Sequence, residues 1–317
     1  MEASGERMTD ARRTRGRRVA VSVSVLGLAA VTGLWLSRVP IATGVIDRHL
    51  AAKGVRARYH IDDLGLGRQR LTKVVIGDPR HPDLVADWVE TVTDMGLSGP
   101  RLVAIHAGHV RARGRHVDGR LTLGEIDRLL SGGGGGAFTL PAIDVALDDA
   151  RMRIETPYGD AGLALTGHGR LDGGFAGRFA LIAGRLGTAD CAGRRVSVAG
   201  TVRSTGRDRR GGYGLDLDGP VRAASLACAG TSIAAPRLAT TATLVLGRLG
   251  DSTLRAEVAT GAIVHPQARA AALSGTVSGR LGTGSDHRMT LRLAARDLAA
   301  LGTRAGRLSL EIGRAHV

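Results

Sequence analysis

Apolar and polar positions alternate along most of the chain. Val145 and Leu147 begin one such run, and the alternation resumes at Met152 and Ile154 after a one-residue phase shift at Asp148–Asp149. A period of two is typical of half-buried strands, and the shift predicts a bulge or a turn. No helix-length periodic segment separates the later runs, which argues against βαβ units. The pattern therefore predicts a mainly β fold, an antiparallel meander with one apolar face and few short helices.

The apolar face is the main candidate for a functional surface. The residues predicted to line it are Met152, Ile154, Leu163, Leu165, Val277, Met289 and Leu291. Two sheets can bury such faces against each other in a closed sandwich or barrel. Alternatively, one long curved sheet can form an open groove whose concave face is covered by lipid acyl chains. Abundant Gly and Ala favour the curved sheet, because small residues let a sheet bend.

The N-terminal region carries the pattern of a membrane anchor. Residues 19–36 contain no charge, and eighteen helical residues span about 27 Å, close to the hydrocarbon thickness of a bilayer. The basic run at residues 12–18 predicts that residues 1–18 form a cytoplasmic tail and that the chain after Arg38 is exported. A cleaved signal peptide is the alternative, since a small-x-small triplet occurs at residues 42–44.

Three further segments divide the exported part. Residues 41–55 predict a short juxtamembrane helix that ends at Gly54, and residues 123–130 predict a second short helix. The glycine-rich run at 131–137 predicts a flexible linker between a first β segment, residues 41–130, and a repetitive β-groove segment, residues 138–311.

Composition changes this picture little. The net charge is +15, but only two of the 44 basic residues are Lys and the chain has no Asn, which indicates a GC-rich genome. Arginines are not interleaved with aromatic residues, so nucleic acid is not an expected partner. Eight aromatic residues are too few for the two girdles of an outer-membrane barrel.

Catalytic chemistry has little support in the sequence. His106 and His109 are three residues apart, a spacing that places them on opposite faces of a strand, so no metal site or cofactor is expected. Cys191 and Cys228 are the only cysteines, and in an oxidising compartment we predict that they form a disulfide. Two reduced, buried cysteines are the alternative.

Residues 44–90 resemble the start of YdbH-type proteins of the AsmA/TamB-like superfamily of bridge-like intermembrane lipid transport proteins. The motifs that carry the resemblance are "DLGLGRQRL", "IGDP" and "ADWVE", with further similarity at residues 118–130 and 147–171. The resemblance runs from about Ala11 to Leu310. It implies an inner-membrane anchor, passage of phospholipid through the periplasm of a Gram-negative bacterium, and a small outer-membrane lipoprotein as partner. The alternative function is a non-catalytic anchored scaffold in envelope assembly.

The last residues have an unusual sequence. "EIGRAHV", at Glu311–Val317, is what a common sequencing adapter encodes when it is translated. We expect residues 312–317 to be an adapter artefact and the native chain to continue beyond Leu310, because YdbH-type proteins are far longer.

Overall fold

The computed structural model describes residues 50–315, except residues 66, 97–98, 118–119, 131–139, 247, 281–287 and 301–302. The predicted basic tail, membrane anchor and glycine-rich linker, and most of the juxtamembrane helix, lie outside the described residues. Within the described part, no helix has both the length and the apolar character needed to cross a bilayer.

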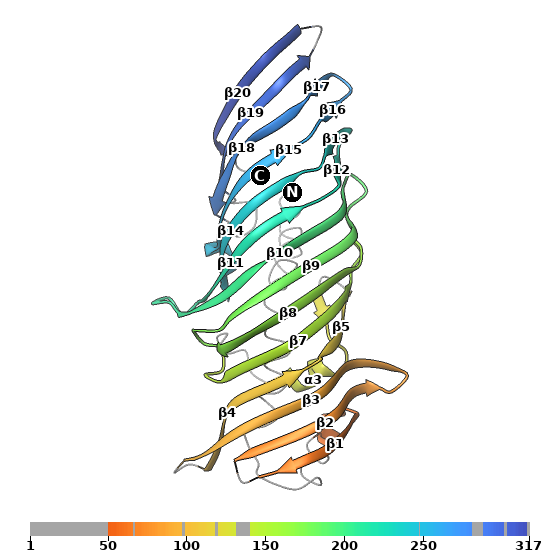
Figure 1. Cartoon of the computed structure of the whole chain (residues 1–317), viewed down its shortest axis with the longest axis vertical. Coiled ribbons are helices and arrows are strands. Elements are labelled where there is room, and N and C mark those ends of the chain that lie inside the picture. The colour runs from red at the N-terminus through yellow and green to blue at the C-terminus, as the bar shows by residue number, and fades with distance from the viewer. Residues whose placement is uncertain are drawn as a thin grey trace, which may run out of the picture.

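The described residues form one large sheet of twenty strands with very little helix (Figure 1). The strands are β1 (Ala57–Leu64), β2 (Arg68–Asp78), β3 (His81–Gly96), β4 (Gly99–Gly108), β5 (Arg111–Val117), β6 (Arg120–Thr122), β7 (Asp144–Glu155), β8 (Ala161–Arg170), β9 (Ala176–Gly187), β10 (Cys191–Arg207), β11 (Tyr213–Arg222), β12 (Ser225–Cys228), β13 (Thr231–Ala234), β14 (Arg237–Leu246), β15 (Thr253–Thr260), β16 (Ile263–His265), β17 (Ala268–Ala270), β18 (Ala272–Arg280), β19 (Arg288–Ala300) and β20 (Thr303–Ala315). The helices are α3 (Ile126–Leu130) and the 3₁₀ turn η1 (Leu249–Asp251).

The sheet is mixed, which corrects the prediction of a purely antiparallel meander. Most neighbouring strands are antiparallel, but β7 runs parallel to both β4 and β5. The chain leaves β5 through β6 and α3 and comes back to start β7 in the same direction, which produces the parallel pairs. A local alternation of period two is the same in both orientations, so it does not distinguish them.

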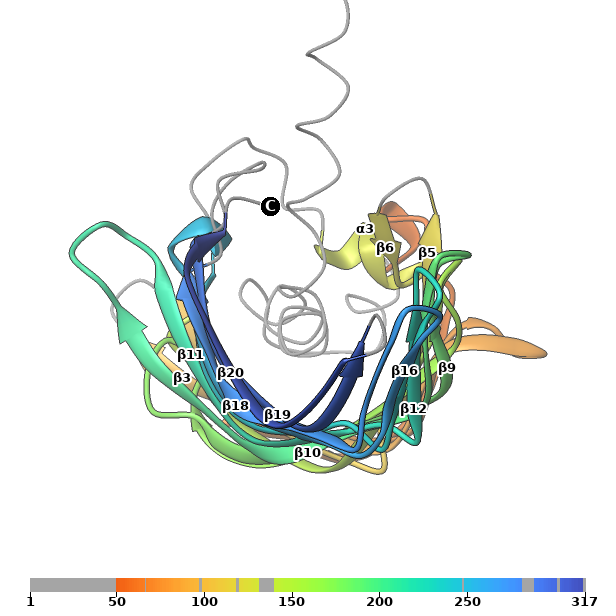
Figure 2. The same cartoon turned by 90° about the horizontal axis from the view of Figure 1, so that it is seen from above.

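The sheet curls into an open trough. Strands cross the trough and follow one another along its length (Figure 1), and the view along its axis shows a U-shaped cross-section (Figure 2). Among the described residues, no second sheet faces the first, and the edge strands β1 and β20 do not pair with each other. The closed sandwich is therefore wrong for this part of the chain, and the curved open sheet is confirmed.

Left-handed residues crease the sheet. Lys73, His109 and Asp149 have φ angles of 52°, 52° and 55°. Each lies between two buried residues that are three positions apart, although a regular strand places such residues on opposite faces. These pairs are Leu71 and Val74, Ala107 and Val110, and Leu147 and Ala150. The register shift between Leu147 and Ala150 confirms the bulge predicted at Asp148–Asp149.

Two short helical segments accompany the sheet. The helical turn that begins the described chain ends at Gly54, whose φ of 66° suits glycine, and Leu50 and Val55 beside it are buried. The helix predicted at residues 123–130 is present as the shorter α3. Both segments pack on the large apolar cluster of the sheet.

The apolar concave face

A row of cross-strand partners runs the length of the trough. Directly paired residues on adjacent strands point to the same face, so successive pairings define a row on one face. The middle row consists of Ala57, Ile76, Leu84, Ala112, Met152, Leu163, Leu181, Val198, Val221, Leu238, Val258, Gly275 and Leu293. Every member is apolar or glycine.

A second row of the same face is as long and as apolar. It consists of Ile61, Leu71, Val89, Ala107, Leu147, Gly167, Gly177, Val202, Leu217, Ala242, Leu254, Gly279 and Met289. At the usual strand spacing of about 4.8 Å, either row extends for roughly 60 Å. The sheet therefore carries one continuous apolar surface rather than separate patches.

The seven residues predicted to line the apolar face all lie on it. Met152 and Leu163 are partners in the middle row, and Met289 ends the second row. Val277 and Leu291 are partners in a row between these two, and Leu165 pairs with Ala150 on the same face. Ile154 pairs with Ala161 next to the middle row. Met152 and Leu165 are buried, whereas the other five are half-buried.

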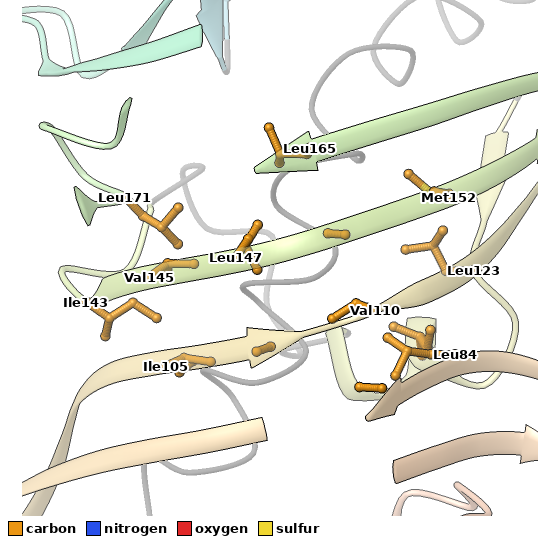
Figure 3. Packing of buried hydrophobic residues seen from close by; sticks show 14 of the residues in the cluster. Leu84, Ile105, Val110, Leu123, Ile143, Val145, Leu147, Met152, Leu165 and Leu171 are labelled. Atoms are coloured by element: carbon orange, nitrogen blue, oxygen red, sulfur yellow. The ribbon is translucent and has the colours of Figure 1, made fainter. Parts of the chain in front are cut away.

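The apolar face is the concave one. Leu123 lies just before α3, and Ile126 is its first residue. Both belong to the same buried cluster as Leu84, Val110 and Met152. α3 lies on the inner side of the U (Figure 2), and the side chains of Leu84, Val110, Leu123 and Met152 lie near one another (Figure 3). A cluster shared with α3 places the apolar rows on the inside.

The convex face is polar and rich in arginine. Along β18, Thr276, Ser278 and Arg280 alternate with the apolar residues of the concave face. At the crease, Arg111 and Arg151 donate hydrogen bonds of 2.6 and 2.7 Å to the Asp149 carboxylate. These bonds hold the pKa of Asp149 below its ordinary value. Charged groups therefore face solvent on the outside and leave the inside to apolar groups.

The two histidines considered as a metal site, His106 and His109, contact different carboxylates. His106 lies 3.8 Å from a Glu90 oxygen, whereas His109 lies 3.3 Å from a different carboxylate, that of Asp87. In the part of the chain that the structure describes, no group of three or more His, Cys, Asp or Glu residues could hold a metal ion.

Cys191 and Cys228 are directly opposite each other on β10 and β12. Their Cα atoms are 4.0 Å apart, and a disulfide joins them in the structure. The bond joins the first residue of β10 to the last residue of β12. It lies on the N-terminal side of Arg195, a residue of β10 in the left-handed conformation.

Sequence reasoning missed several features of the concave face. The central strands contribute residues that had not been selected, and their signal was the same alternation in β9, β10, β11, β14 and β15: Leu181, Val198, Val221, Leu238 and Val258. Polar residues also lie on this face, and the hydroxyls of two of them, Thr91 and Thr240, are buried without a hydrogen-bond partner. The ion pair between Arg56 and Glu125 joins residues 69 positions apart, and no local pattern shows it.

An elongated open sheet with an apolar inside and a charged outside defines the class of β-groove proteins, which expose a long surface suited to apolar ligands. The chain belongs to the YdbH-like family, described as intermembrane phospholipid transport protein YdbH, and the match covers residues 26–312. No curated protein and no solved structure matches the chain. The family confirms the resemblance drawn from the sequence, and it implies phospholipid transport between membranes.

Proposed function

We propose that this chain holds phospholipid acyl chains on its concave face and guides them between the inner and outer membranes. The observation that carries the proposal is the unbroken course of the two apolar rows from β1 to β19. Two rows without a polar member give an acyl chain a path along the trough.

The energetics of burial support this function. Each CH₂ group removed from water contributes about 0.8 kcal/mol, so sheltering one long acyl chain is favourable by over ~10 kcal/mol. The apolar rows, roughly 60 Å long, are about twice the hydrocarbon thickness of a bilayer. Several acyl chains therefore fit end to end along the trough, and none needs a covalent or catalytic step to move.

The proposal includes the setting of the trough. Residues 19–36 anchor the chain in the inner membrane with residues 1–18 in the cytoplasm, so that the sheet lies in the periplasm. A small outer-membrane lipoprotein is the partner that the family resemblance suggests at the far end. Catalysis and nucleic-acid binding have no part in this function.

Photocrosslinking at neighbouring residues tests the proposal. Val277 points into the trough and Thr276 points away from it, so a photoreactive residue at 277 should capture phospholipid and one at 276 should not. The purified protein should also carry phospholipid that mass spectrometry detects. Equal labelling at the two positions, or a lipid-free protein, would contradict the proposal.

A further inference from the structure

The trough is covered by its own chain near one end. α3 lies on the concave side (Figure 2), and Leu123 and Ile126 are 3% and 1% exposed. They share one buried cluster with Leu84, Val110 and Met152 (Figure 3). Two aliphatic side chains thus occupy a place on the apolar face where a lipid acyl chain would otherwise lie.

The surface beneath α3 is of the same kind as the open part of the trough. Leu84, Ala112 and Met152 are consecutive members of the middle row, and Leu163 continues that row onto β8. No change of residue type separates the covered members from the open ones. Continuity of the row makes an acyl chain the occupant that fits the covered surface.

Burial decreases along this row. Leu84 and Met152 are buried and Ala112 between them is half-buried, whereas all the middle-row members on β9, β10, β11, β14 and β15 are half-buried. The later strands therefore offer surface that a lipid can reach directly, and the strands under α3 do not.

Polar contacts with the N-terminal segment and with Asp83 hold α3 in place. The Arg56 backbone N–H and Nε donate to the Glu125 carboxylate at 2.6 and 2.7 Å, and Nη2 of Arg56 lies 2.6 Å from the same carboxylate. The Glu125 N–H donates to Asp83 at 2.9 Å. Arg128 donates to the carbonyl oxygen of Gly54. The Arg56 side chain is 66% exposed, so water competes for its bond. A five-residue helix with these contacts is easier to displace than a strand within the sheet.

We propose that the apolar surface beneath α3 is a second acyl-chain site, closed by Leu123 and Ile126 and opened when α3 moves away. The inference rests on the proposed function, because it assigns a lipid to the same face. With α3 displaced, the middle row is accessible from β3 onward, and a lipid in the open part of the trough can extend under the former position of α3.

Two methionines allow both sites to be probed in one molecule. Met152 lies in the cluster closed by α3, and Met289 lies on the open part of the same face. Photo-methionine has nearly the shape of methionine, so incorporation in the full chain leaves packing intact. After irradiation of the membrane-bound protein, peptide mass spectrometry counts lipid adducts at each position. In the unmodified sequence we expect adducts at Met289 and few at Met152.

Glu125→Gln removes the charge that binds Arg56 and should raise adducts at Met152 about fivefold while leaving Met289 unchanged. Glu155→Gln is the matched control, because it removes a carboxylate that pairs with Arg115 and Arg153 and not with Arg56. The double variant Glu125→Gln/Arg128→Gln removes both side-chain charges that contact the N-terminal segment. Thermal unfolding of each variant verifies that the sheet is folded.

The outcomes separate this inference from the proposed function. Equal labelling of Met152 and Met289 in the unmodified protein means that α3 does not close the site. Unchanged labelling of Met152 in the double variant overturns the second site. Absence of lipid at Met289 in every sample means instead that the proposed function fails.

Discussion

At the scale of single residues, the face of the sheet that a side chain occupies determines the effect of replacing it. Val277 lies half-buried on the concave face beside Ala256 and Leu291, and its neighbour Thr276 lies exposed on the convex face. Val277→Arg places a charge on the lipid path and should lower the amount of phospholipid that copurifies. The free energy of unfolding should fall by only about 1 kcal/mol, because the guanidinium still reaches water.

Thr276→Arg is the control for this prediction, since it adds the same charge to the outer face and should leave bound lipid unchanged. Phospholipid per protein is measured by mass spectrometry, and stability by thermal unfolding. Unfolding of the Val277 variant would show that the face is a protein core, because burying an unpaired charge in a core is far more costly.

The disulfide is a second prediction at this scale. Cys191 and Cys228 are bonded in the structure and enclose a loop with a sequence separation of 37 residues. In the chain-entropy view such a bond stabilises the fold by about 4 kcal/mol, so reduction should lower the melting temperature. Alkylation of the protein purified without reductant should modify no thiol, and two labelled thiols would reject the bond.

Individual contacts could be predicted only where they follow the local pattern. The shared face of the seven selected residues could be predicted, because period two fixes the face of each residue once one strand is oriented. The pair formed by Arg56 and Glu125 depends on how α3 packs against the residues just before β1, and the two residues are 69 positions apart. The alternation of apolar and polar residues within a strand does not predict such a contact.

At the scale of elements, the attachment of α3 should depend on pH. Burial alone would raise the pKa of Glu125, but hydrogen bonds from the Arg56 N–H and guanidinium, with the charges of Arg56 and Arg128, lower the pKa below its usual value. A carboxylate with a depressed pKa stabilises the folded state above its unfolded pKa, near about 4.3, and loses that contribution as pH falls through the lower folded value.

α3 should therefore stay attached at neutral pH and loosen only below about pH 4. The NMR signals of the Ile126 methyl groups report this attachment. Glu125→Gln should remove the pH dependence, and a variant that still loosens over the same range would assign the effect to another group. The change should be small, since Arg56 is largely exposed.

The close approach of β10 and β11 at Gly200 gives a prediction for the stability of these strands. A Cβ atom on Gly200 of β10 would lie 1.9 Å from the Asp218 carbonyl oxygen of β11. Gly200→Ala should force these strands apart and cost about 1–3 kcal/mol of unfolding free energy. Gly184→Ala is the matched control, because a Cβ there meets nothing within 4 Å, and its cost should stay within about 0.5 kcal/mol. Equal costs in chemical denaturation would contradict this account.

Most elements were predictable, whereas their directions were not. Alternation and turn residues indicate strands, and "LGEIDRLL" indicates a short helix, which matches α3. The parallel pairing of β7 with β4 and β5 follows from how the chain returns after α3. That return is a tertiary event, set by packing of Leu123 and Ile126 on the sheet rather than by any residue in β7.

At the scale of the whole molecule, the open trough was one of two architectures that the sequence allowed. One apolar face per strand is equally consistent with two sheets packed together and with one sheet that curves. The structure has the single curved sheet (Figure 2). Left-handed residues such as His109 and Asp149 keep the same face inside where the alternation shifts by one residue. The sequence pattern revealed this shift at Asp148–Asp149 but not at His109.

Burial is uneven along the trough, and this should produce uneven stability. Of the 24 buried residues in the main apolar cluster, only Val202, Leu215 and Leu244 come from β10 onward. Each strand contacts mainly its neighbours, as in solenoid proteins, so local stability follows local burial. We expect amide hydrogen exchange in the lipid-free protein to be slow in β2 to β8 and faster in β15 to β19.

Adding phospholipid should change this gradient in a definite direction. A ligand that binds only the folded state slows exchange where it binds. It raises the free energy of unfolding by about 2.7 kcal/mol when its concentration is a hundred times its dissociation constant. Half-buried rows on β14 to β19 have the most apolar surface left to cover, so protection should rise there most. Strands near α3 should gain little while Leu123 and Ile126 cover them, and more in the Glu125→Gln variant. Uniform protection along the sheet, or protection confined to β2 to β8, would contradict a lipid path along the open part of the trough.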